Sequence, residues 1–171
     1  MNLNKRLVEH DFWMTERLLD RAQTLSDSDL DSPMAFPITV LGFEGEEGTL
    51  RNVLDRIVLA KEVWVAAING RAFDFEGRDL SVAGMLVRNA EAGPAFLRLV
   101  GEIESEGKWD DLFIDALCCP PETFSFGGVV AHVLNFAAVR RTVALREFAR
   151  LGHDDLGDGD PIDWDRAMTK R

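Results

Sequence analysis

One uninterrupted segment, residues 126–151 (FGGVVAHVLNFAAVRRTVALREFARL), constrains the fold more than any other part of the chain. Its apolar side chains fall on more than one face of a helix, which is typical of a helix packed among several others. His132, Phe136 and Arg140 are spaced four residues apart, so a helix places them along one stripe. The sequence therefore predicts a central helix whose middle forms one wall of a site.

Three more segments carry apolar residues at helical spacing. Ser81 is a typical helix N-cap, and Gly70 and Gly107 are typical residues after a helix end. Pro94 removes a backbone hydrogen bond and clashes with the preceding turn, so we expect the helix around it to kink or restart. The expected helices cover residues 4–25, 49–69 and 81–106.

The connections between these helices are less regular. Residues 26–31 (SDSDLD) have the side chains of a helix start and predict one short turn. Residues 32–48 show no clear period and predict a loop, long enough to cover a site. Residues 112–117 (LFIDAL) could form a short strand, although one strand cannot make a sheet. In the polar tail, we expect Leu156, Ile162 and Trp164 to hold the chain on the body.

A length of 171 residues fits one domain, and no internal repeat is present. Four long amphipathic helices, separated by distinct connecting segments, predict an all-α fold that is a four-helix bundle.

The net charge is −11 and the isoelectric point about 4.7. Phosphate backbones and anionic membrane surfaces repel such a protein, so we expect neither as a partner. We find no apolar run long enough to cross a bilayer and no signal core in residues 1–13, and we therefore expect a cytoplasmic protein. The adjacent Cys118 and Cys119 predict two reduced thiols, with a strained vicinal disulfide as the alternative.

The sequence contains no phosphate-binding glycine loop, nucleophile elbow, HExxH or CxxC motif. Of its three histidines, His153 follows a helix-ending glycine and is expected to be solvated. His10 is expected at the surface or half-buried. His132 lies among valines and leucine, where a histidine is usually a core residue with hydrogen-bonded ring nitrogens.

Adjacent arginines in an apolar helix cannot both point into solvent, because successive residues diverge by about 100°. At least one of Arg140 and Arg141 should therefore be partly buried and paired. A salt bridge to a carboxylate is one alternative, and a fork that holds an anionic ligand is the other. The candidate carboxylates are Asp11, Asp55 and Glu62.

Three stretches of the chain carry recognisable motifs. The first is HDFWMTERLLDRAQTLSDSDL, with a tryptophan before an RLL-type stretch, the second is TLRNVLDRIVLAKEVWVAAINGR, and the third is FSFGGVVAHVLNFAAVRRTVALREFARLG. In this order they resemble the DinB/YfiT-like superfamily, four-helix proteins described as metal-dependent hydrolases or thiol-dependent transferases, whose pattern in the third stretch is HVxNHxxxHR. The resemblance covers nearly the whole chain and implies the four-helix fold.

The resemblance also implies a metal held by one histidine of the second helix and two of the fourth. The matching positions here are Arg56, Phe136 and Arg140, none of which can bind a metal ion. We therefore expect no tightly bound metal and no other cofactor. The alternative is a weak site for a divalent metal ion, with oxygen ligands from carboxylates such as Asp55 or Glu62.

We interpret the chain as a metal-free relative that binds a small molecule between its helices. A more specific form of this hypothesis is that the small molecule is an anion. Arg56 and Arg140 would then face each other, with a ligand or an internal carboxylate between them. One alternative is a hydrolase or thiol-dependent transferase with His132 as acid or base. Another is a homodimer that scaffolds a partner. The predicted ligand pocket comprises Arg56, Glu62, His132, Phe136 and Arg140.

Overall fold

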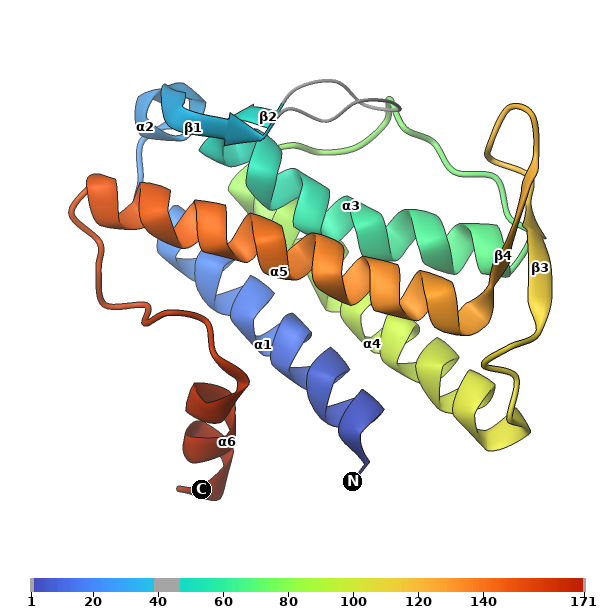
Figure 1. Ribbon diagram of the computed structural model, residues 1–171. Coiled ribbons are helices and arrows are strands. Elements are labelled where there is room, and N and C mark those ends of the chain that lie inside the picture. The colour runs from blue at the N-terminus through green and yellow to red at the C-terminus, as the bar shows by residue number, and fades with distance from the viewer. Residues whose placement is uncertain (1, 39–46, 171) are drawn as a thin grey trace.

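The computed structural model describes residues 2–38 and 47–170 and is mostly helical (Figure 1). This confirms the predicted all-α class. The four predicted long helices are present with boundaries within three residues of those expected. They are α1 Leu3–Ala22, α3 Leu50–Ile68, α4 Val82–Glu106 and α5 Phe126–Arg150.

Each long helix packs against at least two others. α5 lies against α3 and α1, and α4 lies against the same two helices from the other side (Figure 1). The apolar core has two parts. One surrounds Leu54, Ala144 and Phe148 near the C-terminal end of α5, and the other surrounds Phe96 and Val133 near its N-terminal half. The middle of α5 is therefore enclosed by helices on two sides, as its sequence predicts.

Local capping explains where the helices begin and end. The hydroxyl of Ser81 accepts a hydrogen bond from the Gly84 amide, and Gly107 takes a left-handed conformation with φ of 67° at the end of α4. The short helix α2, Asp27–Asp31, begins with a capping box in which Ser26 and Asp29 bond each other's backbone amides. These three predictions from the sequence are confirmed.

The restart predicted at Pro94 is wrong, because α4 continues through it as one helix. The proline deprives only the carbonyl of Ala90 of its helical partner, and Ala90 is exposed, so water can replace the lost bond. Gly93, beside it, allows α1 to approach closely. A Cβ at Gly93 would lie 2.1 Å from Cδ2 of Phe12. The predicted kink at Pro94 stays a prediction.

The loop predicted at residues 32–48 is wrong at both of its ends. Strand β1, Pro33–Ile38, pairs antiparallel with β2, Glu47–Thr49. No alternation was visible in the sequence because β1 contains two prolines, which are tolerated in an edge strand of a two-stranded ribbon. The possibility that this segment covers a site falls mainly on residues 39–46, which lie outside the described residues.

The strand suggested near residue 112 is confirmed as β3, Leu112–Asp115, and its partner is β4, Glu122–Ser125. Their antiparallel register pairs Phe113 with Phe124. The partner strand was missed because ETFS is short and follows two prolines. Cys118 and Cys119 in the connecting turn are free thiols, as expected. Burial and Asp115 raise the pKa of the Cys118 thiol to about 11.

The tail contains a helix that was not predicted from the sequence, α6, Pro161–Thr169, which packs on α1 (Figure 1). Asp160 caps it and Pro161 occupies its first turn, a typical helix start. Leu156 and Trp164 are buried as expected, but Ile162 is 55% exposed, so its predicted contact is wrong. On the short helix, Trp164 takes the inward direction and Ile162, two residues earlier, points away.

By length and composition alone, α5 could cross a membrane, since its most apolar stretch has a mean hydropathy of 1.2. The expectation that the chain has no such run is therefore wrong. In the structure, α5 supplies Ala137, Ala144 and Phe148 to the core. It also carries two buried arginines that pair with carboxylates of other elements. Packing among helices thus accounts for its apolar composition.

Candidate functional site

The predicted stripe on α5 is formed as expected. The guanidinium carbon of Arg140 lies 3.1 Å from the ring centroid of Phe136. The ring of His132 lies 5.5 Å from that of Phe136 and 5.7 Å from that of Trp64 on α3. Arginine over an aromatic face is a favourable cation–π contact. We call the surface formed by Trp64 of α3 and by His132, Phe136 and Arg140 of α5 the α3–α5 face.

Arg140 is held by a carboxylate that was not among those expected from the sequence. Its Nε donates to Oε1 of Glu47 at 3.0 Å, and Nη2 donates to the same oxygen. Both side chains are buried. Burial raises the pKa of Glu47 and the Arg140 charge only partly offsets this, with Asp55 adding to the rise. Arg140 therefore attaches β2 to α5, which is a structural role.

Arg56 lies in the same region and is partly buried. Burial lowers its pKa to about 10, with smaller contributions from the charges of Arg78 and Arg140. The two arginines are therefore electrostatic neighbours, as the resemblance implied. Of the two predicted partners of Arg140, an internal acid or a ligand, the structure has an internal acid. This acid is Glu47 and not one of the three expected carboxylates.

Glu62 belongs to a different group of charges. Its two carboxylate oxygens share the single Nε–H of Arg88 on α4, at 3.0 and 3.2 Å, and Oε2 also accepts from Nη2 at 2.6 Å. Asp55 also pairs with Arg88, at 2.7 Å, and with Arg78. The structure thus places Glu62 and Asp55 in an α3–α4 network, so neither is the partner of Arg140 or Arg141.

His132 is exposed, so the expectation of a core histidine is wrong. Its pKa is lowered by partial burial of the ring and by the Arg140 charge, which keeps the ring neutral at pH 7. No hydrogen bond to its ring comes from the residues that the structure describes. Its role as an acid or base stays a prediction.

The residues at the positions of the implied metal do not fit a metal ion. Arg140 presents donors that are already bonded to Glu47 and stacked on Phe136. Arg56 is a second cation, and an arginine side chain offers a metal ion no lone pair. Within residues 2–38 and 47–170, no group of three or more histidine, cysteine or acidic side chains is placed to hold a metal.

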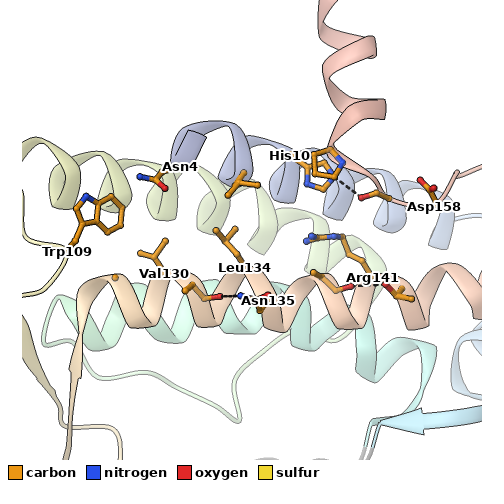
Figure 2. A pocket seen from close by; sticks show the side chains of 15 residues that line it. Asn4, His10, Trp109, Val130, Leu134, Asn135, Arg141 and Asp158 are labelled. Atoms are coloured by element: carbon orange, nitrogen blue, oxygen red, sulfur yellow. Dashed lines mark hydrogen bonds between the residues drawn. The ribbon is translucent and has the colours of Figure 1, made fainter. Parts of the chain in front are cut away.

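A cavity of about 670 Å³ lies on the opposite side of α5, between α5, α1 and the segment that leads into α6 (Figure 2). We call it the α1–α5 pocket. Its apolar wall includes Leu7, Trp109, Val130 and Leu134, whereas polar side chains stand mainly at its α6 end. The polar lining residues are Asn4, His10, Asn135, Arg141, Thr142 and Asp158.

A buried group of three charges lies at this polar end, and Arg141 is its member in the pocket lining. Asp11 on α1 accepts hydrogen bonds from Lys61 Nζ at 2.7 Å and from Arg141 Nη1. The Asp11 and Lys61 side chains are each 1% exposed and that of Arg141 is 8% exposed. Burial would raise the pKa of Asp11, but the two cations hold it below its usual value. Asp11 is one of the three carboxylates expected as partners of Arg140 or Arg141, and the structure pairs it with Arg141.

His10 is 3% exposed, so its predicted surface position is wrong. Its Nε2 lies 3.0 Å from the carbonyl oxygen of Gly159, which fixes the protonated nitrogen of the neutral ring (Figure 2). Burial and the Arg141 charge lower its pKa, against smaller opposite effects of Gly159, Asp11 and Asp160. His10 therefore joins α1 to the segment before α6.

Lys61 was not among the residues singled out from the sequence. A signal was available, because Lys61 follows Ile57 by four residues and precedes Trp64 and Ile68 by three and seven. It therefore stands on the apolar stripe of its helix. A lysine there must be paired, and a carboxylate on another helix is the usual partner.

No protein-family model, curated protein or solved structure matches the chain. The fold and the α1–α5 pocket define a mostly helical protein with a cavity of ligand size. The assignment of function therefore rests on the site itself.

Proposed function

We propose that this protein binds a small organic molecule in the α1–α5 pocket. The observation that carries the proposal is the cavity of about 670 Å³, which is within the usual range for ligand sites. Its lining also has the composition of such sites, with mainly apolar walls and a few polar groups, of which His10, Arg141 and Asp158 stand at one end (Figure 2). His10 and Arg141 at that end are buried and fixed by hydrogen bonds, so the site is preformed.

We also propose that the four long helices are a four-helix bundle of the DinB/YfiT-like type. The contacts support this, since α1 and α3 each pack against both α4 and α5. The order of the three resembling stretches along α1, α3 and α5 supports it as well. In this proposal the metal chemistry of the family is lost and a binding function remains.

The test uses N-phenyl-1-naphthylamine, an uncharged dye whose fluorescence rises in apolar sites. We expect a saturable fluorescence increase with one dye per chain. Ala138→Trp should abolish it, because Ala138 lines the pocket and its enlarged side chain would fill the cavity.

Val139→Trp is the matched control. Val139 is the next residue of α5, is 56% exposed and is not part of the pocket lining. This variant should bind the dye as the wild type does. The proposal is overturned if the wild type shows no saturable signal, or if Ala138→Trp and Val139→Trp bind equally well.

A further inference from the structure

The buried charges indicate which molecules the α1–α5 pocket takes. We infer that its ligand is an amphipathic monoanion, a carboxylate on an apolar chain or ring, whose charged group binds Arg141. This inference rests on the proposed function, because it names the ligand class of the same pocket. It concerns the opposite side of α5 from the residues implied by the family resemblance.

The buried group at the polar end carries unequal numbers of positive and negative charges. Asp11 contributes one negative charge, and Lys61 and Arg141 contribute two positive charges. Asp11 is the acidic partner of both cations among the described residues, so the group has one excess positive charge. Buried charges without a counter-ion are costly, because the surroundings solvate them poorly. A bound monoanion would neutralise the group.

Arg141 is the member of the group that reaches the pocket. Its guanidinium has five N–H donors, and the bond to Asp11 uses Nη1. Figure 2 shows the side chain of Arg141 pointing across the cavity toward His10. Lys61 is deeper, with its ammonium between Asp11 and the carbonyl oxygen of Ile57, 3.1 Å away. A planar carboxylate, with two acceptor oxygens, matches the donor fork of Arg141 better than a group with a single acceptor could.

The rest of the pocket fits an apolar chain. From Arg141 the lining continues along α5 through Leu134 and Val130 toward Trp109, and Asn4 is the polar residue near Trp109 (Figure 2). Leu7 of α1 also lines the pocket. One charged end and a mostly apolar remainder therefore predict an amphipathic ligand.

Asp158 is the acidic residue in the lining, and it would repel a carboxylate. It is exposed, so water and salt screen its charge, whereas Asp11, Lys61 and Arg141 are screened far less. Its Oδ1 also accepts a hydrogen bond from the Asp160 amide, at 3.2 Å. The buried excess charge should therefore dominate.

Octanoate and octanamide test the inference, because they share a chain and a planar head group and differ in charge. Displacement of N-phenyl-1-naphthylamine gives both affinities at pH 7.5. We expect octanoate to bind at least about tenfold more tightly, the usual advantage of a charge-assisted hydrogen bond. Equal affinities would overturn the inference while leaving the proposed function intact. Failure of both compounds to displace the dye would overturn the inference as well.

Two substitutions test the role of the excess charge. Arg141→Gln keeps Asp11 paired with Lys61, and Lys61→Met keeps Asp11 paired with Arg141. Each variant leaves one buried pair with no excess charge, so each should fold. Both should lose most of the preference for octanoate, with octanamide affinity nearly unchanged. Lys61 acts on the ligand only through Asp11 and Arg141. If Lys61 had a merely structural role, its substitution would not change the ratio of octanoate affinity to octanamide affinity.

Asp158→Asn serves as the opposite control and should increase the preference for octanoate slightly. If Lys61→Met retains the full preference, the excess charge is not its source and the inference fails. If Arg141→Gln retains it, the carboxylate does not bind Arg141 and the inference also fails.

Discussion

Lys61 and Asp11, on different helices and fifty residues apart, form an ion pair of 2.7 Å in which each side chain is 1% exposed. Arg141 binds the other oxygen of the same carboxylate. One acid thus pairs with two buried cations, from α3 and α5, and α1 is joined to both helices through it. The stability of the fold and the charge of the pocket depend on this one side chain.

Asp11→Asn should therefore lower the free energy of unfolding by about 3–5 kcal/mol, because it leaves two buried cations without a counter-charge. Lys61→Met should cost only about 1 kcal/mol, since Asp11 keeps Arg141 as its partner. Urea unfolding at pH 7 measures both values. Similar losses in the two variants would contradict the account of Asp11 as the shared partner.

Arg140→Met should destabilise the protein by about 3–5 kcal/mol at pH 7, because Glu47 then stays buried without its partner. The loss should shrink at lower pH. The pKa of Glu47 is already raised, and without Arg140 it rises further, so the carboxyl becomes protonated and its burial costs less. Urea unfolding at pH 7 and pH 5 gives the comparison.

Glu47→Gln in combination with Arg140→Met provides the control. The double variant should recover part of the lost stability, since no buried carboxylate remains. A loss for Arg140→Met that does not depend on pH would argue against the Glu47 pairing.

Gly93→Ala should lower stability by about 1–3 kcal/mol, because the new methyl group would overlap the ring of Phe12 and force α1 and α4 apart. Gly101→Ala is the matched substitution in the same helix. Among the described residues, and apart from the adjoining helical backbone, no heavy atom lies within 4 Å of a Cβ there, so the better helix propensity of alanine should add up to about 1 kcal/mol. Thermal unfolding should show opposite signs for the two variants, and equal signs would disprove the close packing at Gly93.

His10 should make the stability depend on pH below about 6.5. Its folded pKa is lowered from the ordinary value of 6.5, so the unfolded chain binds the proton first. The stabilising contribution is complete above pH 6.5 and is lost as the pH falls through the folded pKa. His10→Gln, which can still donate to the Gly159 carbonyl, should flatten this part of the profile.

His132→Gln is the comparison, because the pKa of His132 is lowered too. His132 is exposed as a residue whereas His10 is buried, so the contribution of His132 should be the smaller one. The measurement is the free energy of unfolding between pH 5 and pH 8 for the wild type, His10→Gln and His132→Gln. It shows which histidine causes the loss of stability at low pH. A profile that flattens only in His132→Gln would contradict the buried position of His10.

Periodicity and capping were enough to predict most of the helical structure. The four long helices, the Ser81 cap and the end at Gly107 are local features, since each depends on residues within a few positions of one another. Strand β2 could not be predicted from Glu47 and its neighbours, because its pairing with β1 and Arg140 is tertiary. α6 has a local start signal at Asp160 and Pro161, but its one buried aromatic residue carries no periodic signal.

The candidate site shows the same division. The cost of an unpaired buried charge predicts that at least one of Arg140 and Arg141 is buried and paired, with Asp11 among three candidate carboxylates. The α1–α5 pocket could not, because it depends on where the segment from Gly152 to Asp160 crosses α1. His10 was misplaced for that reason, since Gly159, which covers it, is 149 residues away.

The most direct test of the account is a titration of ¹⁵N-labelled protein with octanoate, observed through the tryptophan indole N–H signals. Trp109→Phe and Trp64→Phe assign the two relevant signals. Trp109 lines the α1–α5 pocket, and Trp64 lies on the α3–α5 face beside His132. We predict that the Trp109 signal shifts saturably while the Trp64 signal stays in place. A shift of Trp64 without one of Trp109, or no shift of either, would contradict the account.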